Sequence, residues 1–168
     1  MGQTGDSVLV GLPPAEAMEL WTDLDRWPAF IDGFGRRLEA SPEWPERGAG
    51  LVLESTPGGR GRVSERVEAY EAPPPGPEVA MQSHPGRLVT RVGDESLTGE
   101  QTVSFEPAPE GTRVKLTLEY ELAGGGVLQP ITDFLFIRRA LRDSLMRTLG
   151  GFAAEADAVS DEAGRERR

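Results

Sequence analysis

The chain contains no cysteine, so it has neither a disulfide, nor a thiolate nucleophile, nor a zinc site with sulfur ligands. It contains one histidine, His84, which excludes a site with several histidine ligands and disfavours a histidine-dependent catalytic triad. We therefore expect no metal and no cofactor. The lack of cysteine also fits the reducing cytoplasm, where we expect the protein to reside.

Basic residues are scarce, with 18 lysines and arginines against 28 aspartates and glutamates and a net charge of −10. A nucleic-acid partner requires a basic face for phosphate contacts, and docking on an anionic membrane requires the same charge, so both are disfavoured. No apolar run approaches the roughly 20 residues of a spanning helix. The start of the chain, MGQTGDS, lacks the basic and apolar regions of a signal peptide. We expect no nucleic-acid partner and no integral membrane association.

The length of 168 residues fits one domain, and neither an internal repeat nor an internal boundary is visible. We predict a single domain over residues 1–159. The charged end of the chain, residues 160–168, is predicted to be a disordered tail.

The most extended pattern is a helix over roughly residues 128–158. At 100° per residue, its apolar side chains fall on one broad face, which is wide enough to cover a sheet. Arg138 falls in the middle of that face. Three charged residues fall opposite and are expected to face water: Arg139, Asp143 and Arg147. The apolar face comprises Ile131, Phe134, Leu135, Leu141, Leu145, Leu149 and Phe152.

Most of the remaining chain reads as short strands joined by turns that contain proline and glycine. The clearest strand is 112–122, in which apolar and polar residues alternate. Two short helices are predicted after the first strand, one following Pro13-Pro14 and one near 29–31. Strands are predicted at 7–12, 36–40, 51–55, 61–72, 78–83, 88–92, 97–107 and 112–122. Antiparallel strands with segregated helices indicate an α+β fold, and a sheet that curls around a helix usually leaves a cavity.

The segment after the first strand, PPAEAMELWTDLDRWPAFIDG, resembles a stretch in the helix-grip (START-like, SRPBCC) superfamily. Its polyketide cyclase/dehydrase-like members carry a similar PxxxVWxxLTDxxxWPxW pattern, and Phe30 stands here where tryptophan is commoner. The matching residues are Pro14, Trp21, Thr22, Asp23, Trp27, Pro28 and Phe30. The resemblance covers about residues 7–157. It implies the helix-grip fold, in which a curved antiparallel sheet of about seven strands wraps around the long C-terminal helix. Members bind lipids, sterols, hormones or polyketides, and some catalyse cyclisation or dehydration.

Two polar residues share strand parity with apolar neighbours and are expected on the inner face of the sheet. Glu65 aligns with Val63 and Val67, and Gln101 aligns with Val103. A buried charge is unfavourable unless it is paired, so Glu65 and Arg138 either pair across the cavity or meet a polar ligand and water. A structural ion pair and a bulge that turns Glu65 outward are the alternatives. The predicted ligand-binding residues are Trp27, Phe30, Glu65, Met81, Gln101, Phe105, Tyr120, Phe134, Arg138 and Leu141.

His84 precedes Pro85-Gly86 and therefore lies at the end of a strand. It is either an exposed turn residue or an acid/base group at the cavity mouth.

Three functions fit these features. The first is non-catalytic binding of a small hydrophobic ligand, such as a lipid, a polyketide or an isoprenoid-like molecule, between the sheet and the C-terminal helix. The second is a polyketide aromatase/cyclase with Glu65 as base and Arg138 as oxyanion stabiliser. The third is a partner-binding or stress-type module whose cavity is incidental. The sequence allows a monomer or a homodimer.

Overall fold

The computed structural model describes residues 1–75, 84–123 and 131–166. The predicted strand 78–83, which includes Met81, lies outside the described residues. The other strands and the three predicted helices are present. The helices are α1 (Pro14–Thr22), α2 (Trp27–Phe30) and α4 (Ile131–Glu166). The strands are β1 (Gly2–Val10), β2 (Phe34–Ala40), β3 (Gly50–Ser55), β4 (Arg62–Glu71), β5 (Gly86–Gly93), β6 (Leu97–Ala108) and β7 (Gly111–Leu122).

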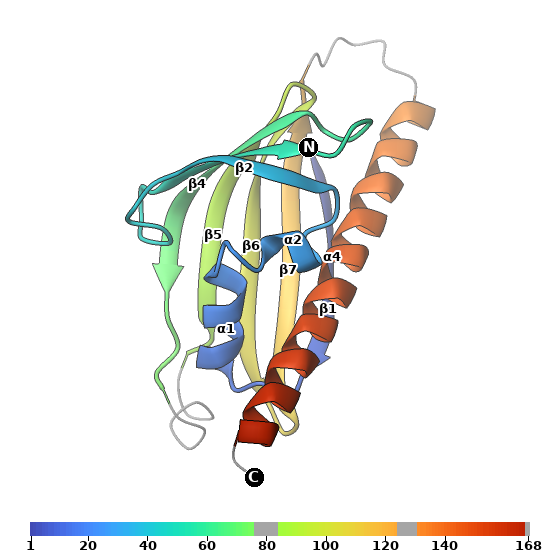
Figure 1. Ribbon diagram of the computed structural model, residues 1–168. Helices are drawn as coiled ribbons and strands as arrows, with labels where there is room; N and C mark the ends of the chain where they lie inside the picture. The colour runs from blue at the N-terminus through green and yellow to red at the C-terminus, as the bar shows by residue number, and fades with distance from the viewer. Residues whose placement is uncertain (76–83, 124–130, 167–168) are drawn as a thin grey trace.

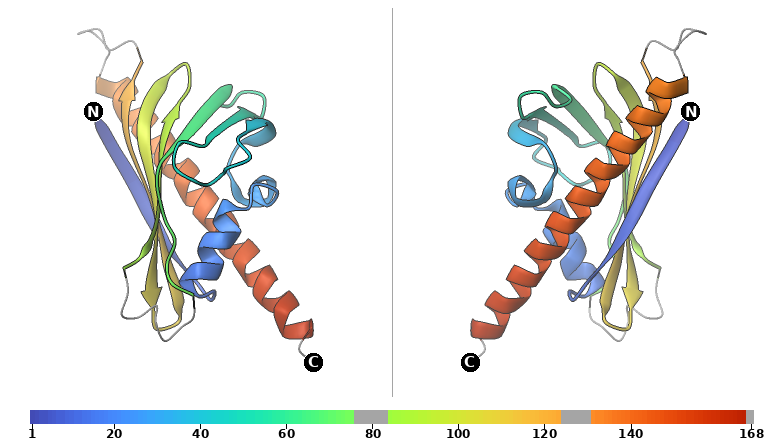
Figure 2. Two further views of the ribbon diagram at one scale, coloured as in Figure 1. Left: turned by 90° about the vertical axis from the view of Figure 1, so that its left-hand side faces the viewer. Right: turned by 90° about the vertical axis from the view of Figure 1, so that its right-hand side faces the viewer.

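All seven described strands form one antiparallel sheet in the order β1-β7-β6-β5-β4-β3-β2. β1 and β2 follow one another in sequence but lie at opposite edges, so α1 and α2 carry the chain across the concave face (Figure 1). The long helix α4 crosses the same face diagonally (Figure 2). The helix-grip architecture expected from the sequence is confirmed.

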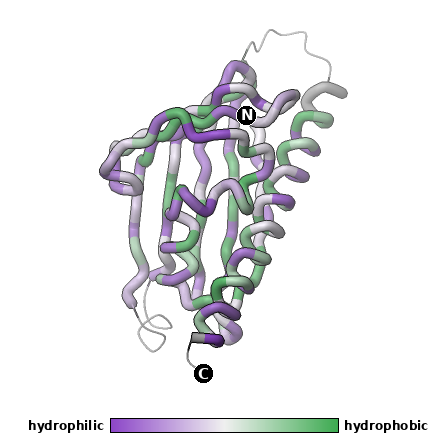
Figure 3. Tube along the Cα trace, viewed as in Figure 1, coloured by the Kyte–Doolittle hydropathy of each residue, from purple (hydrophilic) through white to green (hydrophobic). Residues whose placement is uncertain are grey.

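Alternation along the central strands decides which side chains face α4. In β7, Val114, Leu116, Leu118 and Tyr120 are buried, whereas Arg113, Lys115 and the other residues between them face outward. Figure 3 maps this hydropathy on the trace. β1 begins at Gly2, earlier than predicted, because it pairs with β7 from Gly2 opposite Tyr120 to Val10 opposite Thr112.

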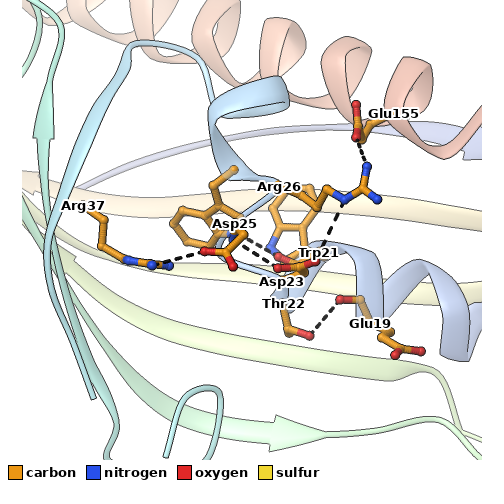
Figure 4. Close-up of polar contacts among 9 residues, drawn as sticks. Glu19, Trp21, Thr22, Asp23, Asp25, Arg26, Arg37 and Glu155 are labelled. Atoms are coloured by element: carbon orange, nitrogen blue, oxygen red, sulfur yellow. Dashed lines mark hydrogen bonds and ion pairs between the residues drawn. The ribbon is translucent and has the colours of Figure 1, made fainter. Parts of the chain in front are cut away.

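The junction of α1 and α2 is fixed by polar contacts of the segment that carries the family resemblance (Figure 4). The Trp27 indole N–H donates to the Trp21 carbonyl at 2.7 Å, and Asp23 accepts from the Asp25 amide at 3.0 Å. Arg26 reaches Glu155 on α4 at 2.8 Å. These contacts attach the two short helices both to each other and to the C-terminal helix.

The C-terminal half of α4 packs as the apolar pattern predicts. Leu145, Leu149 and Phe152 are buried, and the Phe152 ring lies 5.0 Å from that of Trp21. Leu135 is an exception, since 57% of it is exposed. The helix also continues to Glu166, past the predicted start of a disordered tail at residue 160, and Val159 packs against the core.

Candidate functional site

A cavity lies between α4 and the inner face of the sheet. It consists of two adjacent compartments of about 180 Å³ and 730 Å³. Both are bordered by Asp32, Arg60, Gln101, Ser144 and Leu145. The small compartment reaches toward Trp21, Leu53 and Val63, and the large one toward Leu97, Leu118 and Leu141. Charged and polar residues border the cavity where the compartments meet and also beyond that region, for example Glu54 in the small compartment and Asp94 and Arg147 in the large one.

Glu65 is one of three acidic residues that border the small compartment, together with Asp32 and Glu54. It is placed there by strand parity, because Val67 on the same face of β4 is buried in the core. Burial raises the pKa of Glu65 to about 7, since removal from water penalises the charged form. The Thr90 hydroxyl on neighbouring β5 and the positive charge of Arg60 both oppose this shift. The Thr90 contact falls short of a full hydrogen bond. Glu65 can therefore change protonation near neutral pH.

Arg60 is the cationic group that acts on Glu65. It lies in the β3–β4 hairpin and borders both compartments. Its guanidinium pairs with Asp94 in the β5–β6 turn, whose side chain is fully buried and also accepts from the amides of Ser96 and Leu97. The Arg60 side chain is itself 38% exposed. Arg60 is thus held at the cavity by a fixed carboxylate and retains exposed surface for a further contact.

Asp32 connects the loop after α2 to the helix that covers the cavity. Its carboxylate accepts two hydrogen bonds from Arg147, at 2.9 and 3.0 Å, and one from Ser144 at 2.7 Å. Its backbone amide donates to the Thr148 hydroxyl at 3.0 Å. The Arg147 hydrogen bond is the main reason that the pKa of Asp32 is lowered. This network holds α4 against the loop at the cavity wall.

The structure brings three of the predicted ligand-binding residues to the cavity, namely Glu65, Gln101 and Leu141. Trp27, Phe30 and Phe105 are instead packed in the core and are not among the residues that border either compartment. They were expected at the cavity because the sequence pattern indicates which aromatic residues face inward but does not distinguish cavity wall from packed core. Met81 and the side chain of Phe134 lie outside the described residues. His84 is exposed, in agreement with a turn residue.

Tyr120 and Arg138 lie near each other, and neither is among the residues that border the two compartments, although Leu118 and Leu122 on the same face of β7 border the large one. Tyr120 is buried beside Gly2, and burial raises its pKa while the charge of Arg138 lowers it. Arg138 is exposed and borders a separate groove of about 620 Å³ between α4 and β1.

A Glu65–Arg138 pair, one of the alternatives that the sequence left open, is not among the ion pairs of the described residues, and Arg138 borders the groove beside β1 instead of the cavity. A helical projection treats the helix as buried along one face, whereas the first turns of α4 lean on the edge strand β1.

Several polar residues of the site were not predicted, among them Arg60, Asp32 and Asp94. Each lies in or beside a segment that reads as a tight turn, such as Asp32-Gly33. A turn signal indicates where the chain reverses but not what the turn faces. An arginine between glycines in the hairpin was the available signal for Arg60.

Within the ranges that the structure describes, no group of three or more His, Asp or Glu side chains is placed to hold a metal ion. No helix in those ranges is long and apolar enough to cross a membrane.

Solved structures share this architecture at low sequence identity. The Zhui aromatase/cyclase from Streptomyces sp. R1128 has a TM-score of 0.69 and 13% identity, over 93% of this chain and 93% of that chain. The di-domain aromatase/cyclase StfQ of the steffimycin biosynthetic pathway has a TM-score of 0.69 and 16% identity, over 95% of this chain and 51% of that chain. TTHA0849 from Thermus thermophilus has a TM-score of 0.63 and 18% identity, over 95% of this chain and 99% of that chain. At these identities the likeness concerns the fold.

No functionally curated protein matches the chain. Its sequence does match a family described as polyketide cyclase/dehydrase and lipid transport, over residues 1–157. That match includes the α1–α2 segment, the cavity-bordering strands and most of α4. The chain belongs to the polyketide cyclase/dehydrase and lipid transport family.

Proposed function

We propose that the protein binds a small, mainly apolar molecule in the cavity between α4 and the sheet. The observation that carries this proposal is the cavity itself, whose larger compartment of about 730 Å³ lies within the size range of ligand pockets. Membership of a family that includes lipid transport proteins supports it.

The polar groups of the cavity suit a ligand with a hydroxyl or carbonyl at one end. Gln101 borders both compartments and offers an amide donor and an acceptor, while Glu65 and Arg60 offer an acid and a cation. With a pKa of about 7, Glu65 is a donor when protonated and an acceptor when ionised. An apolar ligand with a phenol, enol or ketone group would satisfy these side chains, which would otherwise depend on water.

Binding is tested with the fluorescent probe 8-anilinonaphthalene-1-sulfonate, titrated into the wild type and two variants. Leu141→Trp adds bulk inside the large compartment, whereas Leu9→Trp adds the same side chain on the exposed face of β1. We expect Leu141→Trp to weaken binding at least about tenfold and Leu9→Trp to leave it unchanged. Equal affinities for all three proteins would contradict binding in the cavity.

A second candidate is an enzyme of the aromatase/cyclase type, which the position of Glu65 favours. A general base must face an open cavity and have a pKa near the working pH, and Glu65 meets both conditions. Arg60, rather than the expected Arg138, is the cation placed to stabilise an enolate oxygen. In this reaction Glu65 would take a proton from the carbon between two carbonyls, and the electron pair of the broken C–H bond would move onto the enolate oxygen.

The two candidates differ in what Glu65→Gln changes. For an enzyme, the protein should accelerate hydrogen–deuterium exchange at the central carbon of a β-diketone probe, and Glu65→Gln should remove that acceleration while binding of the fluorescent probe persists. No acceleration by the wild type would leave ligand binding as the function.

A further inference from the structure

One side of α4 faces away from the sheet along the length of the helix (Figure 2). Three large apolar residues of the helix are exposed: Leu135 (57%) at the rim of the groove between α4 and β1, Phe136 (75%) at the rim of the large compartment, and Met146 (48%). At the helical period these residues fall within about 60° of Gly150. An apolar stripe that nothing in the described chain covers is typical of a surface that meets a partner.

Gly150 indicates how closely that partner approaches. Glycine within a helix lowers stability relative to alanine, so its presence calls for a physical reason. The neighbouring Gly151 has one, because a Cβ there would lie 3.0 Å from the Phe30 Cα. A Cβ on Gly150 would meet nothing within 4 Å in the described structure. A backbone that approaches from outside the protomer would account for Gly150.

Charge along α4 identifies what approaches. Residues 131–150 hold four arginines and two aspartates, whereas residues 151–166 hold five acidic residues and one arginine. The exposed Arg139 and Asp161 lie at equal sequence distances on either side of Gly150, and neither has an ion pair among the described residues. Acidic residues in the last turns also oppose the helix dipole, which favours cations there. The charges of α4 are therefore complementary to those of a second α4 that runs in the opposite direction.

We propose that the protein forms a symmetric dimer in which two α4 helices cross in antiparallel orientation at Gly150. The two-fold axis then places Arg139 of each protomer opposite Asp161 of the other, so the same ion pair forms twice. At 1.5 Å per residue these pairs lie about 16 Å from the crossing, where long arginine side chains can span helices that diverge. Met146, close to the crossing, packs on the partner's Ala154.

A basic groove beside α4 supports the same arrangement. It is bordered by Lys115 on β7 and by Arg138, Arg139 and Arg142 on α4, with Asp6 as the acidic residue of its wall. In the antiparallel arrangement, the partner's acidic helix end lies over this groove. A protein with a net charge of −10 thereby gains local attraction where two copies would otherwise repel.

Sedimentation velocity of the full chain over a range of concentrations tests the proposal. We expect a species of about twice the 18.2 kDa protomer mass for the wild type. Arg139→Asp and Asp161→Arg should each weaken the dimer about tenfold, and the double variant should restore it by exchanging the charges. Gly150→Gln should also weaken the dimer, although the monomer has room for that side chain. Arg113→Asp, which makes the same charge change on the outward face of β7, is the control.

A monomer at all concentrations would overturn the proposal. A dimer that Arg139→Asp, Asp161→Arg and Gly150→Gln leave unchanged would also overturn it, because the contact would then lie on another surface. Circular dichroism of each variant confirms that the comparison is between folded proteins.

Discussion

Glu65→Gln replaces a carboxyl that faces the cavity with a neutral group of nearly the same size. In the folded protein the pKa of Glu65 is raised from 4.5 to about 7, mainly because burial penalises the carboxylate. At a pH between these two pKa values, Glu65 is therefore protonated in the folded state and ionised in the unfolded state. The unfolding free energy falls as pH rises through this range, because ionisation of Glu65 stabilises the unfolded state before it occurs in the folded state.

The size of the effect follows from the same two values. Each unit of pKa difference corresponds to about 1.36 kcal/mol, so a rise from 4.5 to about 7 lowers the unfolding free energy by at most about 3 kcal/mol once both states are ionised. Water that enters the cavity would reduce this value by solvating the carboxylate. The glutamine side chain of the variant does not ionise, so the unfolding free energy of the variant does not fall for this reason as pH rises.

Urea denaturation of wild type and Glu65→Gln from about pH 4 to about pH 8.5 measures the effect. The stability of the variant relative to wild type should rise with pH by up to about 3 kcal/mol, most steeply between about pH 5 and about pH 7. Glu121→Gln, at an exposed position on the outward face of β7, is the matched control for the loss of one carboxyl group. Parallel curves for Glu65→Gln and wild type would refute the assignment of Glu65 to a desolvated position in the cavity.

Four further substitutions test the packing of α4. Leu145→Asp should lower the unfolding free energy by about 3 kcal/mol or more in urea denaturation, because it buries a carboxylate at a position that is 8% exposed, and normal stability would contradict the assigned face. Gly150→Ala should stabilise the protomer by up to about 1 kcal/mol, because alanine favours the helix and its Cβ meets nothing there. Gly151→Ala should destabilise the protomer, because its Cβ meets Phe30. Equal thermal shifts of the two variants would contradict this difference. Asp32→Asn should lower the melting temperature at neutral pH. Its difference from wild type should shrink as pH falls from 3.8 through the lowered pKa of Asp32, because protonation of the carboxylate removes this stabilisation; a constant difference would show that the Arg147 contact is not responsible.

The fold could be predicted because its signals are local and repeated. In the strand 112–122, burial of one face produces an apolar residue at every second position. In α4, burial of one face produces the helical spacing of apolar residues around Leu145 and Phe152. The start of β1 was missed because Gly2–Asp6 has weak strand preference and is held by pairing with β7, which is a long-range contact.

The site was predicted only where strand parity decides orientation. Glu65 and Gln101 were placed on the inner face by parity with their neighbours, and both border the cavity. Arg138 was misplaced because the diagonal path of α4 cannot be obtained from the sequence of the helix alone. Arg60 was missed because its partner Asp94 is in a different hairpin, and the two meet only through the register of β4 and β5.

We propose that the space between α4 and the sheet is a ligand-binding cavity. A crystal structure of the protein with bound 8-anilinonaphthalene-1-sulfonate tests this proposal, because the probe could bind either in the cavity or on the exposed apolar side of α4. We expect the probe between α4 and the inner face of the sheet, in contact with Leu141 and Gln101. A probe bound only on the outward face of α4 at Met146, with side chains filling the cavity, would contradict this proposal.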